Sequence, residues 1–455
     1  MIYLNGINPK TGEYLVPPVE ADDLLDLVAG SDQGDQTGFQ SYLHSKEAVA
    51  GLPDGVDEND PAEAGWGVIF HENEDREIIN AFQPLIEHRQ TQIPQQRIKT
   101  LRYRAGQNFN RWLAGYGVGS GHIDPEKVPF YLLIAGNPEM IPFAFSQRLG
   151  MEYRVGRLSF DRAADYGNYI DSLIRFERQQ AKKQTANLLV FAPSHDAATQ
   201  LSCDHLAEPL AQKIADRACV DRLLREDATK ADLLDRLRAG APQFLFSASH
   251  GLGLDLADED QAGYQGALLC QRTCEHGPLA ADDFLSAADI TPELDLTGMT
   301  AFFFACFSAA TPSHDRFFRK KGLPHQLAKR SFFSALPLRL LSKPNGAALA
   351  VLGHIDRAWG FSIVNERSDE LLIPFENAFL RPLNGRPTGQ ALKDFYDKYA
   401  SYSIELTDLM DTRELGGDLD PKELVLAWAR RNDAGGYILL GDPAARILPA
   451  GSSAP

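Results

Sequence analysis

The sequence contains little cysteine: five residues in 455, at positions 203, 219, 270, 274 and 306. Such an odd and sparse set argues against the disulfide frameworks that hold small secreted domains together, and it predicts reduced thiols. Long apolar runs are missing too: no stretch of 18 apolar residues occurs, and the first twenty residues lack the basic start and apolar core of a secretory signal. We therefore expect a cytoplasmic protein with no membrane-spanning segment.

Positive charge is also in short supply. Lys and Arg total 45 against 62 Asp and Glu, which gives a net charge of −17. A chain with this charge repels phosphate backbones and anionic lipids, so we expect neither nucleic acid nor a membrane as a partner. Hydrophobic residues at 44% and charged residues at 24% are ordinary for a globular protein.

Three regions of the chain differ in composition and periodicity. Residues 1–64 are rich in Gly, Asp, Pro and Ser, and we expect an acidic, irregular N-terminal extension there. In residues 65–183, apolar runs such as WGVIFH alternate with stretches of helical periodicity, which predicts an α/β subdomain. Residues 184–455 repeat this rhythm. The sequence thus predicts the α/β class, with two doubly wound, mostly parallel sheets in tandem subdomains.

Two runs that read as buried strands end in reactive residues. FLFSAS (244–249) leads to His250 and Gly251, and AFFFA (301–305) leads to Cys306. Reactive groups gather outside the carboxyl ends of parallel strands, because the loops there vary while the sheet fixes their roots. A neighbouring imidazole can take the proton of a thiol, so His250 and Cys306 form a candidate Cys/His dyad. The backbone N–H groups of Gly251 and Cys306 could bind an oxyanion.

A structural explanation exists for each of these residues alone. A free cysteine at the end of a hydrophobic strand is usually a packed small side chain, and a His-Gly pair is a common turn. The joint occurrence of both at strand ends, 56 positions apart (250 to 306), favours the catalytic interpretation.

The spacing, with FLFSASHG and AFFFACFS, resembles the caspase-like cysteine peptidases, and most of all the gingipain-type peptidases and CHAT domains. YILLGDPAARI (437–447) resembles the closing strand and turn of gingipain-type domains. FYLLIAGNPEMIP followed by YRVGRLSFD resembles the subdomain that precedes their catalytic half, and GAALAVLGHIDRAWG resembles the helix and strand after the nucleophile. The likeness covers about residues 66–448 and leaves the first 64 outside it.

The resemblance implies a caspase-like three-layer sandwich with residues 184–455 as its catalytic subdomain. It also implies hydrolysis of peptide bonds in protein substrates without metal or organic cofactor. Cys306 would form the acyl-enzyme, His250 would transfer the proton and Gly251 would help hold the oxyanion. Because bacterial CHAT peptidases often serve defence or cell-death systems, a restricted protein substrate and an activating protein partner are further expectations. No carboxylate that would orient the histidine can be identified from the sequence.

Substrate preference must come from loops. Phe304 occupies the position where clostripain-like enzymes and metacaspases carry an Asp that selects basic side chains. Trp359 is a candidate wall of the substrate cleft, or else a structural Trp. In the same loop, Asp356 would select a basic residue at the cleaved bond, whereas Arg357 would select an acidic one.

Two further segments are strongly charged. The acidic loop 254–261, with Asp255 and Asp258, favours a basic substrate, although such runs are usually only solvated surface. Residues 314–331 are basic, and this segment is either a site of self-cleavage or a basic docking surface.

Other interpretations of the reactive residues remain. Cys270, Cys274 and His276 could supply three zinc ligands, but no fourth ligand follows at a familiar spacing. His314 and Asp315 lie close after the candidate nucleophile, where a mobile surface loop is the expectation. The whole chain could also be an inactive interaction module, or a thiol acyltransferase that uses the same acyl-enzyme.

Overall fold

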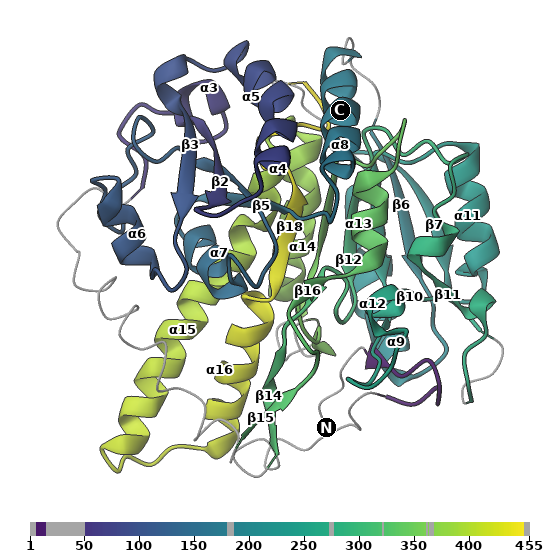
Figure 1. Ribbon diagram of the computed structural model, residues 1–455. Coiled ribbons are helices and arrows are strands. Elements are labelled where there is room, and N and C mark those ends of the chain that lie inside the picture. The colour runs from purple at the N-terminus through teal and green to yellow at the C-terminus, as the bar shows by residue number, and fades with distance from the viewer. Residues whose placement is uncertain are drawn as a thin grey trace.

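A ten-stranded sheet forms the centre of the protein, with helices packed on both of its faces (Figure 1). The computed structural model describes residues 6–14, 51–179, 186–272, 277–320, 323–360, 363 and 368–449. The strand order is β3-β2-β4-β5-β18-β17-β12-β8-β6-β7. The predicted three-layer α/β architecture is confirmed.

Each half of the sheet is parallel within itself. The first half consists of β3 (Ile98–Tyr103), β2 (Trp66–His71), β4 (Tyr131–Ala135) and β5 (Arg154–Leu158). The second half consists of β17 (Ala350–His354), β12 (Thr300–Phe304), β8 (Phe244–Ala248), β6 (Asn187–Ala192) and β7 (Cys219–Leu224).

The last strand joins the two halves. β18 (Tyr437–Gly441) is antiparallel to β17 along its whole length, and it pairs with β5 through Leu440 and Arg157. The two sheets expected from the sequence are therefore two halves of one continuous sheet. The physical reason is that a C-terminal strand fills the gap between two edges that would otherwise expose unpaired backbone groups.

The central strands are continuous apolar runs because both of their faces are buried. All five residues of β12 are buried, and the ring of Phe302 packs against Phe375, Phe379 and Phe395. Burying one such ring is worth about 1.5–3 kcal/mol. This aromatic cluster fixes the strand whose end carries Cys306.

Helices cover the first half and link it to the second. They are α3 (Pro61–Ala64), α4 (Arg76–Ala81), α5 (Gln83–Gln90), α6 (Phe109–Gly115), α7 (Phe143–Gly150) and the long α8 (Ala163–Gln179). The second half carries α9 (Ala197–Ser202), α10 (Glu208–Ile214), α11 (Lys230–Ala239), α12 (Gln261–Tyr264), α13 (Ala335–Ser342), α14 (Ser368–Leu383), α15 (Lys393–Glu414) and α16 (Pro421–Ala434). None of the helices in the described ranges is long and apolar enough to cross a membrane.

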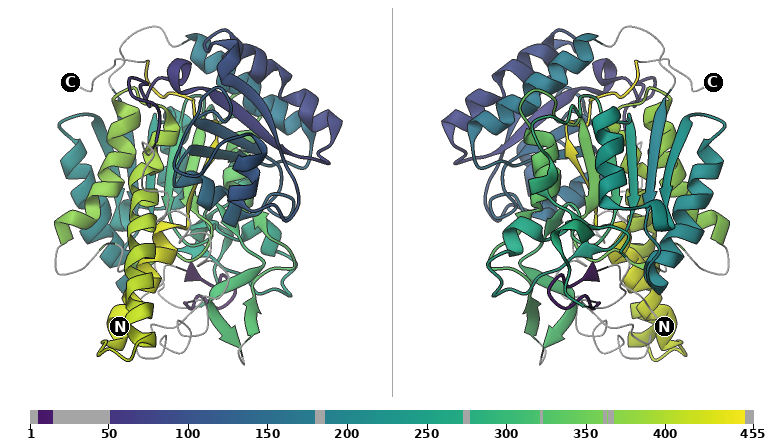
Figure 2. Two further views of the ribbon diagram at one scale, coloured as in Figure 1. Left: turned by 90° about the vertical axis from the view of Figure 1, so that its left-hand side faces the viewer. Right: turned by 90° about the vertical axis from the view of Figure 1, so that its right-hand side faces the viewer.

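A second, four-stranded sheet lies beside the end of β8. Its strands are β1 (Gly6–Ile7), β9 (Gly251–Leu252), β10 (Leu268–Leu269) and β11 (Phe284–Leu285), in that order. β1 belongs to the segment expected to be irregular, yet it pairs with β9, and Ile7 packs in a small core with Leu252. Figure 2 shows β1 at the same end of the molecule as the hairpin β14–β15.

Two short antiparallel pairs follow Cys306. β13 (Ala310–Thr311) pairs with β16 (Phe332–Phe333), and β14 (His314–Lys320) pairs with β15 (Leu323–Gln326). The surface loop expected at His314 is thus a strand. The Ser331 N–H donates to Glu139 Oε1 at 2.8 Å, so the chain after Cys306 also contacts the first half.

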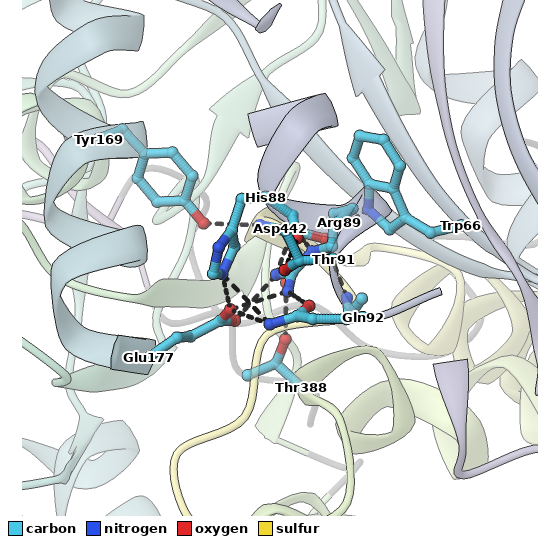
Figure 3. Close-up of polar contacts among 10 residues, drawn as sticks. Trp66, His88, Arg89, Thr91, Gln92, Tyr169, Glu177, Thr388 and Asp442 are labelled. Carbon is cyan, nitrogen blue, oxygen red and sulfur yellow. Dashed lines mark hydrogen bonds and ion pairs between the residues drawn. The ribbon is translucent and has the colours of Figure 1, made fainter. Parts of the chain in front are cut away.

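A buried ionic network ties β18 to the helices of the first half (Figure 3). The Arg89 guanidinium donates to the carboxylates of Asp442, directly after β18, and of Glu177 in α8, with its Nη atoms 2.8 to 2.9 Å from them. His88 Nε2 lies 2.6 Å from Glu177 Oε2, and the Trp66 indole donates to Asp442. Each buried charge in this network has an opposite charge beside it, as burial requires.

Candidate active site

His250 lies two residues after the end of β8 and is fully buried. The backbone on both sides of its ring is held by neighbouring strands. The Ser249 N–H donates to Phe304 O at 3.1 Å, and the Leu269 N–H donates to His250 O at 3.0 Å. The imidazole is therefore presented by the sheet and by β10 rather than by a free loop.

Asp196 is the group that orients this imidazole. His250 Nε2 lies 2.7 Å from Asp196 Oδ2. The carboxylate is itself fixed, because Asp196 caps the N-terminus of α9 and accepts the Thr199 N–H at 2.8 Å. Burial alone would raise the pKa of Asp196, but its interactions with His250 hold that pKa well below the usual range.

The Asp196 contact decides which ring nitrogen can act. A carboxylate accepts a hydrogen bond from a protonated Nε2, so the neutral imidazole carries its lone pair on Nδ1. His250 Nδ1 is buried and has no hydrogen-bond partner among the described residues. This nitrogen can therefore act as a base, because its lone pair is not used in a hydrogen bond there.

Sequence reasoning missed Asp196, although the signal was present. The residue follows the buried strand NLLVFA (187–192) after a short turn, at the carboxyl edge where reactive groups are expected. The Asp196 and His250 positions are 54 apart in the chain, so local pattern alone does not connect them.

Cys306 lies two residues after the end of β12 and is also fully buried. Its Sγ lies 3.8 Å from Ala358 O, and no hydrogen bond joins the thiol to His250 in the described part of the chain. Burial raises the pKa of the Cys306 thiol, which is therefore protonated at neutral pH in this conformation. The next residue, Phe307, has a φ of 55°, a left-handed conformation that turns the chain sharply at the thiol.

The backbones of the two candidate catalytic segments are in direct contact. β8 and β12 pair in parallel register with Ala248 opposite Phe304. Just beyond, a Cβ atom placed on Gly251 would overlap the carbonyl oxygen of Cys306. Glycine is thus required at 251 by close approach of the two chains. The structure thus brings the backbones of Gly251 and Cys306 into contact.

The three candidate residues of the 356–359 loop lie near Cys306 but face the interior. Asp356, Arg357 and Trp359 are all at most 5% exposed. Arg357 Nη1 lies 2.7 Å from Asp315 Oδ2, and the backbone N–H of Trp359 donates to Asp433 Oδ1 at 3.0 Å. We expected a cleft wall that faces solvent. In this conformation, ion pairing and apolar packing hold the loop in the interior instead.

The acidic loop is contacted by the chain's own N-terminal segment. Asp255 is exposed, whereas Asp258 Oδ2 lies 2.6 Å from Lys10 Nζ. Four residues further on, the ring of Tyr14 meets the ring of His250 edge to face, with centroids 5.4 Å apart. Residues 6–14 thus reach both the acidic loop and the candidate catalytic histidine.

The alternative reactive residues are the cluster Cys270, Cys274 and His276 and the pair His314 and Asp315. Cys274 and His276 lie outside the described residues, while burial raises the pKa of the Cys270 thiol to about 12. Asp315 is buried against Arg357, and His314 lies beside the Ser313 hydroxyl at 3.1 Å.

A second histidine shares the Asp196 carboxylate. His195 Nε2 lies 3.6 Å from Asp196 Oδ2, and the rings of His195 and His250 have centroids 5.9 Å apart. Burial lowers the pKa of His195 to about 4, so its ring is uncharged at neutral pH. The sequence analysis did not single out this residue.

Several solved structures are similar to the chain at low sequence identity. A solved structure described as a protease has a TM-score of 0.47 at 9% identity, with 84% of this chain and 78% of that chain covered. The complex of the pro- and mature domains of RgpB from Porphyromonas gingivalis has a TM-score of 0.43 at 11% identity, with 84% and 79% covered. The separase–securin complex of Saccharomyces cerevisiae has a TM-score of 0.31 at 13% identity, with 69% and 16% covered.

The family of the chain follows from its match to a sequence-family model. No functionally curated protein is significantly similar to the chain. The model of Peptidase family C25, in contrast, matches residues 67–448, which is most of the chain. The chain therefore belongs to peptidase family C25, the gingipain family of caspase-like cysteine peptidases.

Proposed function

We propose that the chain is an endopeptidase that cleaves protein substrates, with Cys306 as nucleophile and His250 as general base. The observation that carries the proposal is the pairing of His250 with Asp196 at 2.7 Å, at the end of a strand that is hydrogen-bonded to the strand of Cys306. A buried histidine oriented by a carboxylate, with its second nitrogen unpaired, is the arrangement that activates a neighbouring nucleophile.

The proton transfers follow from this arrangement. His250 Nδ1 takes the proton of the Cys306 thiol as the sulfur attacks the scissile carbonyl carbon, and Asp196 stabilises the imidazolium. His250 then gives the proton to the leaving amine, which breaks the peptide bond and leaves a thioester on Cys306. Water, deprotonated by His250, hydrolyses the thioester and regenerates the thiol. The N–H groups of Gly251 and Cys306 are the proposed donors to the oxyanion.

Access to the thiol requires movement of the surrounding chain. Cys306 is fully buried and Trp359 beside it is fully buried as well. We propose that an activating protein partner, or the substrate itself, shifts the 356–359 loop and frees Arg357 or Asp356 to bind the substrate side chain. Asp255 and Asp258 would bind a basic segment of that substrate.

The biological setting belongs to the same proposal. We propose a cytoplasmic peptidase of a bacterial defence or cell-death pathway, in which restricted access to Cys306 prevents cleavage until the partner binds. Residues 65–183 would act as the non-catalytic subdomain and residues 184–455 as the catalytic one.

A positional peptide library tests the proposal. The wild type should cleave after one class of residue, and Cys306→Ala should cleave nothing. Cys219→Ala is the matched control, because Cys219 is an exposed cysteine on the edge strand β7 and should keep full activity. Equal cleavage by wild type and Cys306→Ala would refute the assignment. Thioester formation with transfer to an added amine instead of water would indicate an acyltransferase.

A further inference from the structure

His195 is a buried histidine whose contact with Asp196, at 3.6 Å, is too long for a hydrogen bond. Its side chain is 3% exposed, and neither ring nitrogen has a hydrogen-bond partner among the described residues. Leaving a buried polar group unpaired has a cost in folding free energy. The proposed peptidase mechanism does not use His195, so this cost calls for an explanation.

The surroundings of His195 supply two more ligand atoms. One ligand atom each from His195, Asp196 and His250 lies within 4.8 Å of the others. Asp196 Oδ2 is the common neighbour, at 3.6 Å from His195 Nε2 and 2.7 Å from His250 Nε2. Ligands of tetrahedral zinc at about 2.0–2.1 Å from the metal lie roughly 3.3 Å from one another. Small side-chain shifts would therefore place all three atoms at zinc distance.

We propose that His195, Asp196 and His250 form a binding site for Zn²⁺. Two imidazoles and one carboxylate are borderline ligands typical of this ion, and a water molecule would complete the tetrahedron. Of the charged groups that act electrostatically on His195, Arg272 opposes a bound cation and Asp283 favours it. Asp196 contributes the one formal negative charge of the site itself.

The proposed consequence is inhibition, and this part rests on the proposed function. Zinc bound at His250 Nε2 displaces the single ring proton, which Nε2 shares with Asp196. This proton moves to Nδ1, so the ring stays neutral and Nδ1 has no lone pair to accept the thiol proton of Cys306. Zinc would thus block the base without touching the sulfur.

Cobalt spectroscopy of the metal-free full-length chain tests the site independently of activity. Added Co²⁺ should give visible d–d absorption without thiolate-to-cobalt charge transfer, and Zn²⁺ should displace it. His195→Gln should weaken binding at least about tenfold. His195→Phe, a ring without ligand atoms, should do the same and guards against a folding defect in one variant. His205→Gln is the matched control, because His205 is exposed and lies outside the cluster.

The outcomes separate the site from the proposed function. Thiolate charge transfer, or equal Co²⁺ binding by wild type and both His195 variants, would overturn the site. Peptide cleavage that Zn²⁺ inhibits in wild type, with an inhibition constant at least about tenfold weaker in His195→Gln, would support it. Equal zinc sensitivity of the two would overturn it while the peptidase assignment stands. Binding that depends on His195 in a chain that cleaves no peptide would support the site and count against the proposed function.

Discussion

At the scale of single residues, the carboxylate of Asp196 has the largest chemical consequence. It contacts His250 Nε2 at 2.7 Å and so selects the tautomer with the lone pair on Nδ1. It also opposes the positive charge that develops on the ring during proton transfer. Both effects need the negative charge and not merely a hydrogen-bonding oxygen.

Asp196→Asn should therefore lower kcat without unfolding the protein. The amide is isosteric, but its N–H donates a hydrogen bond to Nε2, which leaves the ring proton on Nδ1. We expect a loss of roughly 10²–10⁴-fold in kcat, the range in which general base catalysis operates. Steady-state kinetics with the peptide selected from the library measures it. Asp216→Asn, at an exposed position, serves as control. A loss of less than threefold in Asp196→Asn would contradict the role of Asp196.

Gly251 is constrained by contact rather than by its own conformation. A Cβ atom there would overlap the Cys306 carbonyl oxygen, which is backbone and cannot rotate away. Gly251→Ala should push the two strand ends apart and lower kcat/KM at least about 100-fold, as the loss of one oxyanion donor does. Gly263→Ala, where nothing lies within 4 Å of the added methyl, should retain wild-type kcat/KM and the wild-type melting temperature. Equal activity of both variants would exclude the contact as functional.

At the scale of elements, the position of a strand in the sheet decides how well the sequence predicts it. β8 and β12 are central, buried along their whole length and mostly apolar, so their sequences indicated strands that lead to His250 and Cys306. β3 and β7 are the outermost strands and carry mostly partly buried or exposed residues, among them Lys and Arg. Edge strands of this kind have no apolar run to detect.

The strand β1 was unpredictable for a different reason. It has two residues, and its partner β9 is distant in the sequence. Its sheet pairing depends on long-range contacts: Ile7 packs against Leu252, and the Gly253 N–H donates to Ile7 O at 2.8 Å. The composition of residues 1–64 predicts an irregular segment and contains no sign of this pairing.

Ile7→Ala should loosen the contact between β1 and β9. Removing a buried Ile side chain costs about 2–5 kcal/mol where the site cannot collapse. Hydrogen exchange of the backbone over 251–254 should accelerate at least about tenfold, while exchange over β4 stays unchanged. Lys10→Ala is the comparison, since an ion pair with an exposed lysine contributes little. Unchanged exchange over 251–254 in Ile7→Ala would mean that β1 does not stabilise the segment after His250.

At the scale of the whole molecule, β18 and the network around Arg89 hold the two halves together. The rhythm of strands and helices predicted both halves, but their junction depends on the pairing of Leu440 with Arg157, which no local pattern encodes. Asp442 lies directly after β18 and contacts Arg89 from α5. Local patterns are equally limited for the candidate site. His250 and Cys306 could be identified from their strands, whereas Asp196 and the burial of Trp359 follow from tertiary packing.

The Arg89 network predicts a loss of stability in acid. Burial raises the pKa of Glu177, but Arg89 and His88 outweigh it and lower that pKa to about 2. A carboxyl whose pKa is depressed on folding stabilises the protein above its unfolded pKa, near 4.3, and this contribution is lost as the pH falls toward 2. Glu177→Gln, which resembles the protonated side chain, should therefore lower the free energy of unfolding by about 3 kcal/mol at pH 7.

Urea unfolding of both proteins between pH 7 and pH 2 measures this effect. The difference between wild type and Glu177→Gln should be constant above about pH 5 and shrink below it. Glu226→Gln, at an exposed position in the other half, should match the wild type throughout. A difference that stays constant down to pH 2 would show that the charge of Glu177 is not what stabilises the network.

The central claim is that the Cys306 thiol is the nucleophile and that His250 activates it. Covalent capture tests it most directly: a peptide bearing a thiol-directed electrophile, built on the library's preferred sequence, is incubated with the chain, and the modified residue is mapped by mass spectrometry. The account predicts one adduct, on Cys306, absent in Cys306→Ala and formed at least about 100-fold more slowly in His250→Ala. An adduct only on the exposed Cys219, or equal rates at Cys306 with and without His250, would contradict it.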